Sequence, residues 1–439
     1  MKMDNNSKIV LLNVENNSIK VKKEYAPPFG LLIAASVLLK HGMTVSLAHI
    51  IEDEEVESKL LSLCQDACMV GFSTMTTSNL VSTMKASRLL KKAGHYIFWG
   101  GVHATLLPET SLKEDFVDAV LRGEAEANLV EFIQWRRGLI SSNDVKGLCY
   151  KDEDGNVFIS NIPLPVPAHK LSCHAFHLID IRRYLQIEDY SFRNEQKVIR
   201  NVLPYMTSKG CSKKCTFCYN TMINHATWRG YPLNQVIEEM DWLKNTYDVE
   251  GWYFYDDNFF GDVERAWSIL RYFKMPSFVE VDLGKITDSF IENAKQCCIE
   301  RLYIGIESGS DRILKKIKKG ITVEMIKDRV SLCNKRGISM ELSFMVLFPT
   351  ETPDELQATF ELIEELRQYN HVKIDGPKIF NPYPGAELYN ELIMSGWKPP
   401  STNEEWAKYE RDISPLETGF ELSDKHYKIL EIWKQNFQN

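Results

Sequence analysis

Short apolar runs alternate with segments of helical periodicity along the first third of the chain. Five apolar runs predict strands, at residues 9–14, 44–48, 68–73, 96–99 and 118–121. Residues 30–40 and 79–93 carry apolar positions at helical spacing, and a glycine soon after each segment, Gly42 or Gly94, favours helix termination. Strands that alternate with helices in this way predict a doubly wound, Rossmann-like parallel sheet.

The same alternation returns in the second half of the chain. Six further strands are predicted, centred near residues 203, 252, 279, 302, 343 and 378. Six strand–helix units predict a partial (β/α)6 barrel rather than a full eightfold barrel. Beyond Gly396 the composition changes to aromatic residues among charges, which we interpret as a short helical appendage that covers the barrel.

A proline-rich stretch separates the two patterns. The prolines within residues 162–167 hold the chain extended, because each one restricts the residue before it. Residues 152–155 predict a hairpin turn just before this stretch. Four regions follow: a Rossmann-like domain at 1–136, a connector at 137–200, the partial barrel at 201–390 and a helical C-terminal region at 391–439.

Composition narrows the class of protein. The 439 residues fit more than one domain, and 44% hydrophobic with 26% charged residues is typical of a globular protein. The longest mainly apolar stretch, residues 31–39, is too short to span a bilayer, and we see no secretory leader. Ten cysteines in such a chain predict reduced thiols and a cytoplasmic location. The net charge of −8, without a basic stripe, disfavours a nucleic-acid partner.

Three cysteines in one short loop are the most specific chemical feature. Cys211, Cys215 and Cys218 follow the strand near residue 203. A four-iron cluster is usually held by four thiolates, so three would leave one iron open to a ligand. A structural zinc site would need a second Cys or His pair, and the nearest histidine, His225, stands alone. The spacing therefore favours a 4Fe–4S cluster over zinc or a disulfide framework.

This loop resembles the signature of the radical S-adenosylmethionine (radical SAM) enzymes. The resemblance includes the glycine before the first cysteine, Gly210, and the aromatic residue before the last, Phe217. It implies that the open iron binds the methionine end of SAM. Electron transfer into the sulfonium would then release a 5′-deoxyadenosyl radical.

Two strand ends of the first domain carry small and hydroxyl-bearing residues. The third strand ends in the hydroxyl-rich residues 73–78, and the fourth in Gly100 and Gly101. Ligands of doubly wound sheets bind beyond the carboxyl ends of the strands, although a Gly-Gly pair is also explained by a tight turn.

Residues 25–30, 100–109 and 122–126 together resemble the cobalamin-binding domain of one radical SAM subfamily. An Asp-x-His-x-x-Gly motif, the source of a lower cobalt ligand in other cobalamin proteins, is replaced by residues 13–17. His103 is accordingly interpreted as a loop-shaping or nucleotide-tail contact, with a purely structural histidine as the alternative. The resemblance implies these cobalamin contacts: Ser73, Thr74, Thr76, Gly100, Gly101, Val102, His103, Ala104, Gly123 and Glu124.

The barrel domain supplies the SAM contacts that the resemblance implies. Asp256 and Asp257 follow a strand, where two adjacent carboxylates need partners, although a helix cap explains one of them. Glu307 begins a small-residue turn, with helix capping or pairing to Lys315 or Lys318 as the alternative. The implied SAM contacts are Tyr219, Asp256, Asp257, Glu307, Ser308, Ser343 and Phe380. Substrate hydrogen bonds are assigned to Tyr219, Asn220, Asn381 and Tyr383.

The resemblance implies an enzyme that uses a 4Fe–4S cluster, SAM and cobalamin to methylate an unactivated carbon of a small metabolite or natural-product intermediate. The alternative is radical cyclisation, ring contraction or rearrangement with the same cofactors, and a third hypothesis is a non-catalytic cobalamin or cluster sensor. The predicted partners are the small-molecule substrate and an electron donor such as flavodoxin or ferredoxin, with no membrane.

Overall fold

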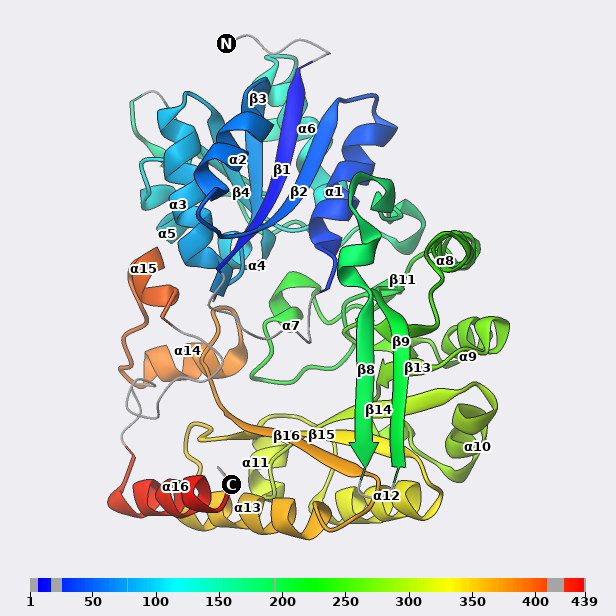
Figure 1. Ribbon diagram of the computed structural model, residues 1–439. Coiled ribbons are helices and arrows are strands. Elements are labelled where there is room, and N and C mark those ends of the chain that lie inside the picture. The colour runs from blue at the N-terminus through cyan, green and yellow to red at the C-terminus, as the bar shows by residue number, and fades with distance from the viewer. Residues whose placement is uncertain are drawn as a thin grey trace. The chain divides into compact units, whose positions relative to one another are not determined.

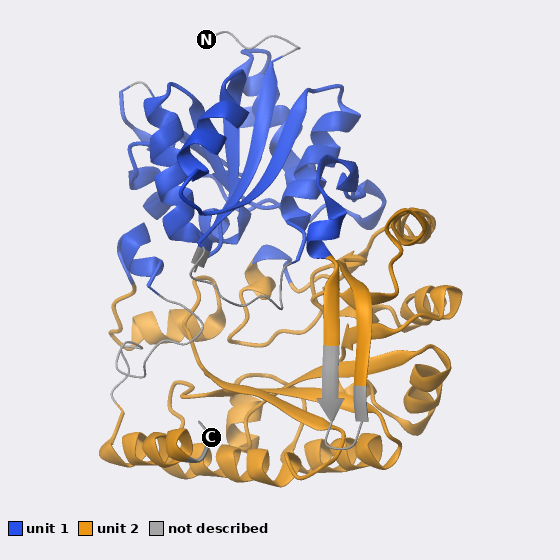
Figure 2. Ribbon diagram, viewed as in Figure 1, with its two compact units in different colours: residues 1–184, 223–225, 400–410 blue, residues 185–222, 226–399, 411–439 orange. Residues whose placement is uncertain are grey.

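The computed structural model describes residues 7–16, 26–76, 78–152, 154–192, 195–408 and 422–437. The chain forms two compact units, each of which includes segments from elsewhere in the sequence (Figure 2). Unit 1 comprises residues 1–184, 223–225 and 400–410, and unit 2 comprises residues 185–222, 226–399 and 411–439. The residues that the sequence pattern assigns to a connector, 137–200, are thus divided between the two units.

Unit 1 is built on a sheet with seven strands among the described residues, in the order β2-β1-β3-β4-β5-β6-β7. Strands β1 to β5 are parallel, whereas β6 and β7 form an antiparallel hairpin at one edge. The predicted turn between them is confirmed by Asp152, whose backbone N–H donates to the carbonyl of Asn156; Glu153 lies outside the described residues. The strands are β1 (Lys8–Glu15), β2 (Val45–Ile51), β3 (Ala67–Ser73), β4 (Tyr96–Gly100), β5 (Ala119–Leu121), β6 (Leu148–Lys151) and β7 (Val157–Phe158).

Helices cover both faces of this sheet (Figure 1). Helix α1 is buried along most of its length and packs on α6, while α2 and α3 contact each other. Side chains such as Leu32, Phe72, Trp99 and Phe132 fill the core, which explains why β1, β3 and β4 read as continuous apolar runs. The helices are α1 (Phe29–Lys40), α2 (Val56–Cys64), α3 (Ser78–Lys92), α4 (Gly101–Leu106), α5 (Pro108–Lys113), α6 (Ala125–Arg136) and α15 (Asn403–Trp406).

Unit 2 contains a curled sheet with the order β16-β15-β14-β13-β12-β9-β8. The six strands that the sequence predicts are present and parallel, so the partial barrel is confirmed. Strand β8 was not predicted; its mixed polar and apolar sequence pairs antiparallel to β9 at the edge. The strands are β8 (Gln186–Phe192), β9 (Glu195–Tyr205), β10 (Ser208–Lys209), β11 (Arg229–Gly230), β12 (Gly251–Phe254), β13 (Ser277–Glu280), β14 (Ile299–Glu307), β15 (Ser339–Val346) and β16 (Val372–Ile379).

Helices α8, α9, α10, α12 and α13 lie on the outer side of the curled sheet (Figure 1). Helix α16 packs on α13, where Phe360 and Trp433 stack with their ring centroids 5.3 Å apart. Within the described part of the chain, no helix is both long and apolar enough to cross a membrane. The helices are α7 (Asn220–Ile223), α8 (Leu233–Tyr247), α9 (Val263–Phe273), α10 (Asp288–Gln296), α11 (Asp311–Lys316), α12 (Val323–Lys335), α13 (Pro353–Leu366), α14 (Glu387–Met394) and α16 (Asp424–Phe437).

Candidate active site and cofactor-binding loops

The three cysteines of the loop after β9 line one pocket of about 230 Å³ in unit 2. The backbone N–H of Cys218 donates to the carbonyl of Cys215 at 3.2 Å, which closes the loop on itself. Thr216 anchors the loop to the end of α11, because its N–H donates to the carbonyl of Ile317 at 3.1 Å. The predicted metal-binding cysteines are therefore brought together beyond the end of a barrel strand, where barrel chemistry is found.

The surroundings of the thiols suit an iron–sulfur cluster. Burial raises the pKa of Cys211 and Cys215 and raises that of Cys218 to about 12, a cost that bound iron would offset by displacing the protons. The N–H of Lys213 and the side-chain amide of Asn258 donate to the Cys211 sulfur at 3.4 and 3.7 Å. Such hydrogen bonds to sulfur are among the features that tune clusters. No three His, Cys, Asp or Glu side chains in the described ranges are arranged to hold a single metal ion.

Charged side chains surround the same pocket. Asp257 accepts a hydrogen bond from the N–H of Gly210 at 3.0 Å, and Glu307 pairs with Lys319 at 2.7 Å. Glu280 lines the pocket from the end of β13, and among the described residues its carboxylate has no hydrogen-bond or ion-pair partner. Desolvation in the pocket and the neighbouring acids Asp257 and Glu307 raise the pKa of Glu280 to about 7 against the opposing charge of Lys319, although the residue as a whole is exposed.

Asp256 has a different environment from Asp257. Its carboxylate accepts hydrogen bonds from the N–H of Thr207 at 3.1 Å, from the Thr207 hydroxyl at 2.7 Å and from the Ser208 hydroxyl. Burial raises the pKa of Asp256 to about 6 against these contacts. The side chain is 2% exposed and does not line the pocket. These hydrogen bonds connect the end of β12 to the start of the cysteine loop.

Of the predicted SAM contacts, Asp257 and Glu307 line the cysteine pocket, as does Asn220 from the predicted substrate contacts. Ser308 is buried against Thr359, with 3.3 Å between the two hydroxyl oxygens. The remaining predicted residues do not line it: Tyr219, Ser343, Phe380, Asn381 and Tyr383. Sequence reasoning missed Glu280, Lys319 and Asn258, which do line it. Glu280 could have been found from the sequence, because side chains alternate between the two faces of a strand. Glu280 therefore lies on the same face as Phe278, two residues earlier.

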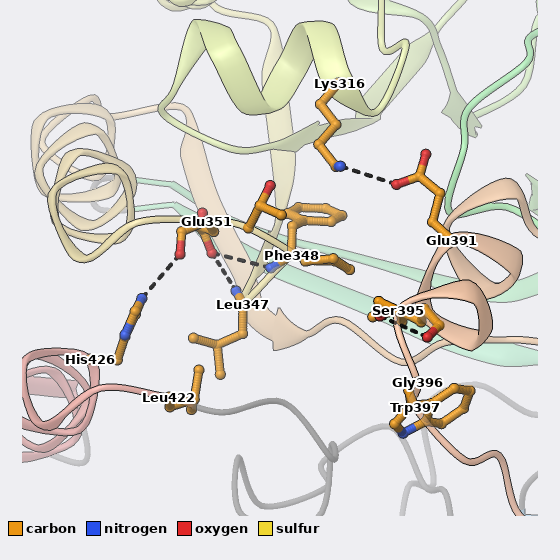
Figure 3. Close-up of a pocket in the computed structure, with 13 residues that line it drawn as sticks. Lys316, Leu347, Phe348, Glu351, Glu391, Ser395, Gly396, Trp397, Leu422 and His426 are labelled. Carbon is orange, nitrogen blue, oxygen red and sulfur yellow. Dashed lines mark hydrogen bonds and ion pairs between the residues drawn. The ribbon is translucent and has the colours of Figure 1, made fainter.

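A second and larger pocket, of about 520 Å³, lies beside the loop that follows β15 (Figure 3). Phe348 lines it and also packs on Phe217 of the cysteine loop, with 6.0 Å between ring centroids. Glu351 accepts from the N–H groups of Leu347 and Phe348 at 2.5 and 3.3 Å, and burial raises its pKa to about 7. These contacts fix the shape of the loop that supports the aromatic neighbour of the cysteines.

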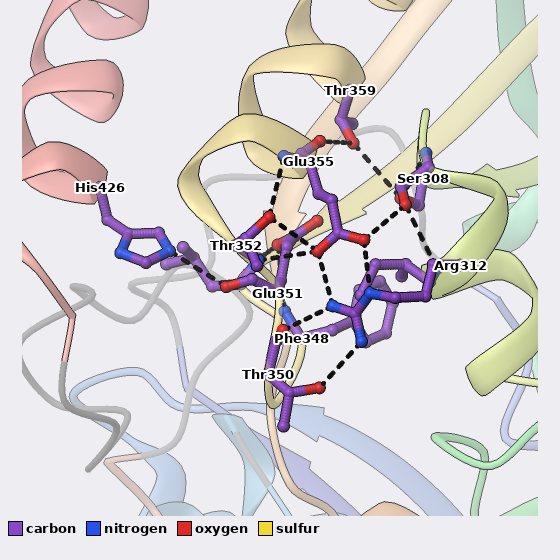
Figure 4. A network of polar contacts seen from close by, with 12 residues as sticks. Ser308, Arg312, Phe348, Thr350, Glu351, Thr352, Glu355, Thr359 and His426 are labelled. Carbon is purple, nitrogen blue, oxygen red and sulfur yellow. Dashed lines mark hydrogen bonds and ion pairs between the residues drawn. The ribbon is translucent and has the colours of Figure 1, made fainter.

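A polar network holds this loop in place (Figure 4). The Arg312 guanidinium donates to both carboxylate oxygens of Glu355 at 2.6 Å and to the carbonyl of Thr350 at 2.6 Å. Glu355 also completes a capping box with Thr352 at the start of α13. His426 of α16 donates to the carbonyl of Glu351 at 3.1 Å, because its other ring nitrogen accepts from the Ser423 N–H.

In unit 1 the predicted cobalamin residues gather at the ends of β3 and β4. These neighbouring strands pair in register at Ser73 and Gly100. The Thr74 hydroxyl donates to the carbonyl of Gly100 at 2.7 Å and accepts from the N–H of Ala104 at 3.1 Å. Gly101 has a φ of +88°, and a Cβ atom there would lie 2.7 Å from the backbone of Thr74. The turn therefore requires glycine because two loops approach closely.

The remaining predicted contacts shape the same edge of the sheet. His103 is fully buried, and its two ring nitrogens lie 3.0 Å from the Thr76 hydroxyl and 2.9 Å from the Asn403 side-chain oxygen. Burial lowers the pKa of His103 to about 4. Gly123 donates its N–H to the Thr105 hydroxyl at 3.1 Å, and Glu124 accepts from the N–H of Val166 at 2.9 Å. Tyr25, at the start of the first cobalamin-like motif, lies outside the described residues.

The two units define a class of protein, an enzyme in which a doubly wound cofactor domain precedes a partial-barrel cluster domain along the chain. Family models agree: one described as the radical SAM superfamily matches residues 205–363, and one described as a B12 binding domain matches residues 19–133. The chain thus combines a radical SAM superfamily domain with a B12 binding domain, as cobalamin-dependent radical SAM enzymes do, and its cofactors are a 4Fe–4S cluster, SAM and cobalamin.

Two relatives of known sequence match this chain over more than two thirds of its length. An uncharacterized methyltransferase of Pyrococcus horikoshii is 28% identical over 439 residues, which cover 97% of this chain and 89% of that protein. The cytidylyl-2-hydroxyethylphosphonate methyltransferase of Streptomyces wedmorensis is 24% identical over 349 residues, which cover 72% and 64%.

Among solved structures, the radical SAM methyltransferase TsrM from Kitasatospora setae, with cobalamin and a 4Fe–4S cluster bound, has the same fold. Its TM-score is 0.67 at 16% identity, over 90% of this chain and 76% of that chain.

Proposed function

We propose that this enzyme methylates an unactivated carbon of a small metabolite or natural-product intermediate. The carrying observation is that Cys211, Cys215 and Cys218 surround one pocket in a chain that also has a B12 binding domain. Radical chemistry with cobalamin suits a carbon that is not nucleophilic, since such a carbon cannot attack a sulfonium methyl group directly. Both relatives described above are named as methyltransferases, which supports the same reaction.

The cofactors supply the difficult steps, namely reductive cleavage of SAM and delivery of a methyl group. The residues of the chain bind and orient them. Asp257 and Glu307 place negative charge at the cysteine pocket, where the ammonium and sulfonium of SAM need it, and Lys319 balances the Glu307 charge at 2.7 Å. Phe217 and Val281 add apolar lining, which keeps part of the pocket from water.

The net charge of the chain and a solved structure of similar fold support a small-molecule substrate. A net charge of −8 is unfavourable for binding a polyanion such as RNA. A structure of TsrM holds tryptophan as its substrate together with a SAM analogue, which is a small molecule in a protein of this fold. We also propose that reducing electrons come from a protein such as flavodoxin or ferredoxin.

The proposal is tested by stoichiometry. The protein is reconstituted anaerobically with iron, sulfide and hydroxocobalamin, then incubated with methyl-deuterated SAM, a reductant and a small-molecule extract of the source organism. We expect one 5′-deoxyadenosine and one S-adenosylhomocysteine for each deuterium-labelled product, measured by mass spectrometry. Deoxyadenosine and product without S-adenosylhomocysteine would instead establish cyclisation or rearrangement. A protein that binds the cofactors and cleaves no SAM under any of these conditions would be the sensor.

A further inference from the structure

The C-terminal part of unit 1 reaches into the predicted cobalamin loop. Asn403 lies on the short helix α15, about 300 residues after His103 in the chain, and both side chains are 0% exposed. The Asn403 amide nitrogen donates to the carbonyl of Thr110 at 3.2 Å and to the carboxylate of Glu114 at 2.8 Å. Its oxygen lies 2.9 Å from Nε2 of His103. One buried amide thus joins α4, α5 and α15.

These contacts determine the protonation of His103. The carbonyl of Thr110 and the carboxylate of Glu114 only accept hydrogen bonds, so the Asn403 nitrogen must face them and its oxygen must face the ring. Nε2 of His103 is then the protonated nitrogen, and Nδ1 accepts the hydrogen bond of the Thr76 hydroxyl at 3.0 Å. Both ring nitrogens are engaged by the protein, so the ring has no lone pair for a cobalt ion.

The backbone of His103 also connects the loops at the ends of β3 and β4. The N–H of His103 donates to the carbonyl of Thr74 at 3.1 Å, and its carbonyl accepts from the N–H of Leu107 at 2.8 Å. Gly101 lies two residues earlier, where the loops approach too closely for any side chain. The His103 ring contacts Thr76 in the loop after β3, and the backbone of the same residue bonds Thr74, so a rotation of the ring would disturb the turn that presents Gly100 and Gly101 at the edge of the sheet.

We propose that Asn403 is a positioning residue of the cobalamin site. It holds His103 as the neutral Nε2-protonated tautomer and, through His103, gives the β4 loop the shape that receives the corrinoid. The segment at residues 402–407 is accordingly part of the cofactor-binding unit, although it lies far outside the matched B12 domain at residues 19–133. This inference rests on cobalamin binding and is independent of which reaction the enzyme performs.

The test uses the full chain with its cluster reconstituted, and hydroxocobalamin as the probe. Its dissociation constant is measured by equilibrium dialysis for the wild type, Asn403→Leu and Asn403→Asp. Asn403→Leu removes every hydrogen bond of the amide, and Asn403→Asp places a second carboxylate against Glu114. We expect at least tenfold weaker binding for each, because a buried hydrogen-bonding group left without its partner is costly.

A rescue variant separates positioning from general loss of structure. In the double variant Asn403→Asp/Glu114→Gln, the new Gln amide donates to the new Asp carboxylate, so the pair is restored with its polarity reversed. We expect binding within about threefold of the Glu114→Gln single variant. Ser87→Ala is the matched control: it removes the 2.9 Å hydrogen bond to the buried Trp99 indole in the same unit, and its affinity should stay within about twofold of wild type.

Wild-type affinity in both Asn403 variants would overturn the inference. So would an equal loss in Ser87→Ala, or the absence of any rescue in the double variant while its thermal unfolding and iron content match the wild type. Failure of the wild type itself to bind hydroxocobalamin would contradict the cofactor assignment on which the proposed function rests. The two failures are therefore distinguishable in one experiment.

Discussion

The cysteine pocket of unit 2 and the strand-end loops of unit 1 use polar residues in opposite ways. In the pocket, the three thiols and Glu280 face open space, and the surrounding charges are only partly balanced. In the loops, Thr74, Thr76 and His103 are buried and hydrogen-bonded to other parts of the protein. One region offers side-chain chemistry to its ligand, and the other uses side chains to set the shape of its backbone.

This difference indicates how each site can be damaged. A site that depends on ligating atoms fails when an atom is removed, even if the backbone does not move. A site that depends on backbone shape fails when the loop is forced open, even if no residue that touches the ligand is changed. Each of the following predictions is a change that should affect one region and leave the other intact.

Loss of one cluster thiol should have the largest effect. Cys218→Ala removes a ligand that the remaining two thiols cannot replace, so we expect iron content and SAM cleavage to fall by more than about 100-fold while cobalamin binding persists. Iron analysis, electron paramagnetic resonance of the reduced protein and deoxyadenosine assays measure the outcome. Cys333→Ala, which changes a buried cysteine of α12, is the control and should retain its iron. A Cys218→Ala protein with a full cluster would contradict the assignment.

Gly101→Val should have the converse effect. The new Cβ atom would lie 2.7 Å from the nitrogen and oxygen of Thr74, which are backbone atoms and cannot move alone. We expect cobalamin affinity to drop at least tenfold with the iron content unchanged, measured by equilibrium dialysis and iron analysis.

The control for this change is Gly138→Val. Gly138 also has a positive φ, +74°, but a Cβ atom there would meet nothing within 4 Å. The variant carries the same type of backbone strain and should bind cobalamin normally. Equal affinities in the two variants would mean that close approach of the loops does not matter for the cofactor.

Removing one charge of the buried ion pair in the cysteine pocket should have a smaller effect than the two changes above, and it should act on the stability of the protein. Lys319→Met would leave Glu307 buried without the cation that lies 2.7 Å away, and breaking a buried pair in this way costs about 3 kcal/mol. We expect a lower thermal unfolding temperature for the apoprotein, measured by circular dichroism.

Lys318→Met is the matched change one residue earlier. Lys318 pairs with Glu387 in an exposed position, and an exposed pair contributes less than about 1 kcal/mol. Its unfolding temperature should stay close to that of the wild type. If both variants lost the same stability, the buried pair would have no special role in the pocket.

The sequence predicts the fold well because the spacing of apolar residues and the residues at strand ends are local signals. The apolar runs of β1, β3 and β4 and the six parallel strands of unit 2 appear close to their expected positions. The cysteine spacing identifies the cluster loop for the same reason. Strand β8 was missed because its residues carry charges that gain partners only in the folded sheet, as Glu188 does with Arg301 at 3.3 Å.

The side-chain partners were harder to predict because they are distant in sequence. Asp256 and Asp257 are adjacent and look equivalent, yet one fastens Thr207 and the other faces the pocket. Asn403 carried no signal, because nothing local indicates that a residue on a four-residue helix reaches His103. Such contacts depend on how the elements pack, which a pattern of hydrophobic and polar positions does not specify.

The smallest expected effect is a difference in pH dependence between the two regions. The pKa of Glu280, raised to about 7 by desolvation in the pocket and by neighbouring acids, means that this carboxyl group loses its proton as the pH rises from about 6 to about 8. The growing negative charge attracts the positively charged SAM, so we expect SAM affinity to increase a few-fold over this range. His103, whose pKa burial lowers to about 4, stays neutral throughout, so cobalamin affinity should be flat. Titration of the cluster spectrum with SAM at both ends of this pH range measures the slope, and Glu280→Gln should remove it. An unchanged slope in that variant would assign the titration to another group and weaken the contrast between an open, charged pocket and a closed, neutral loop.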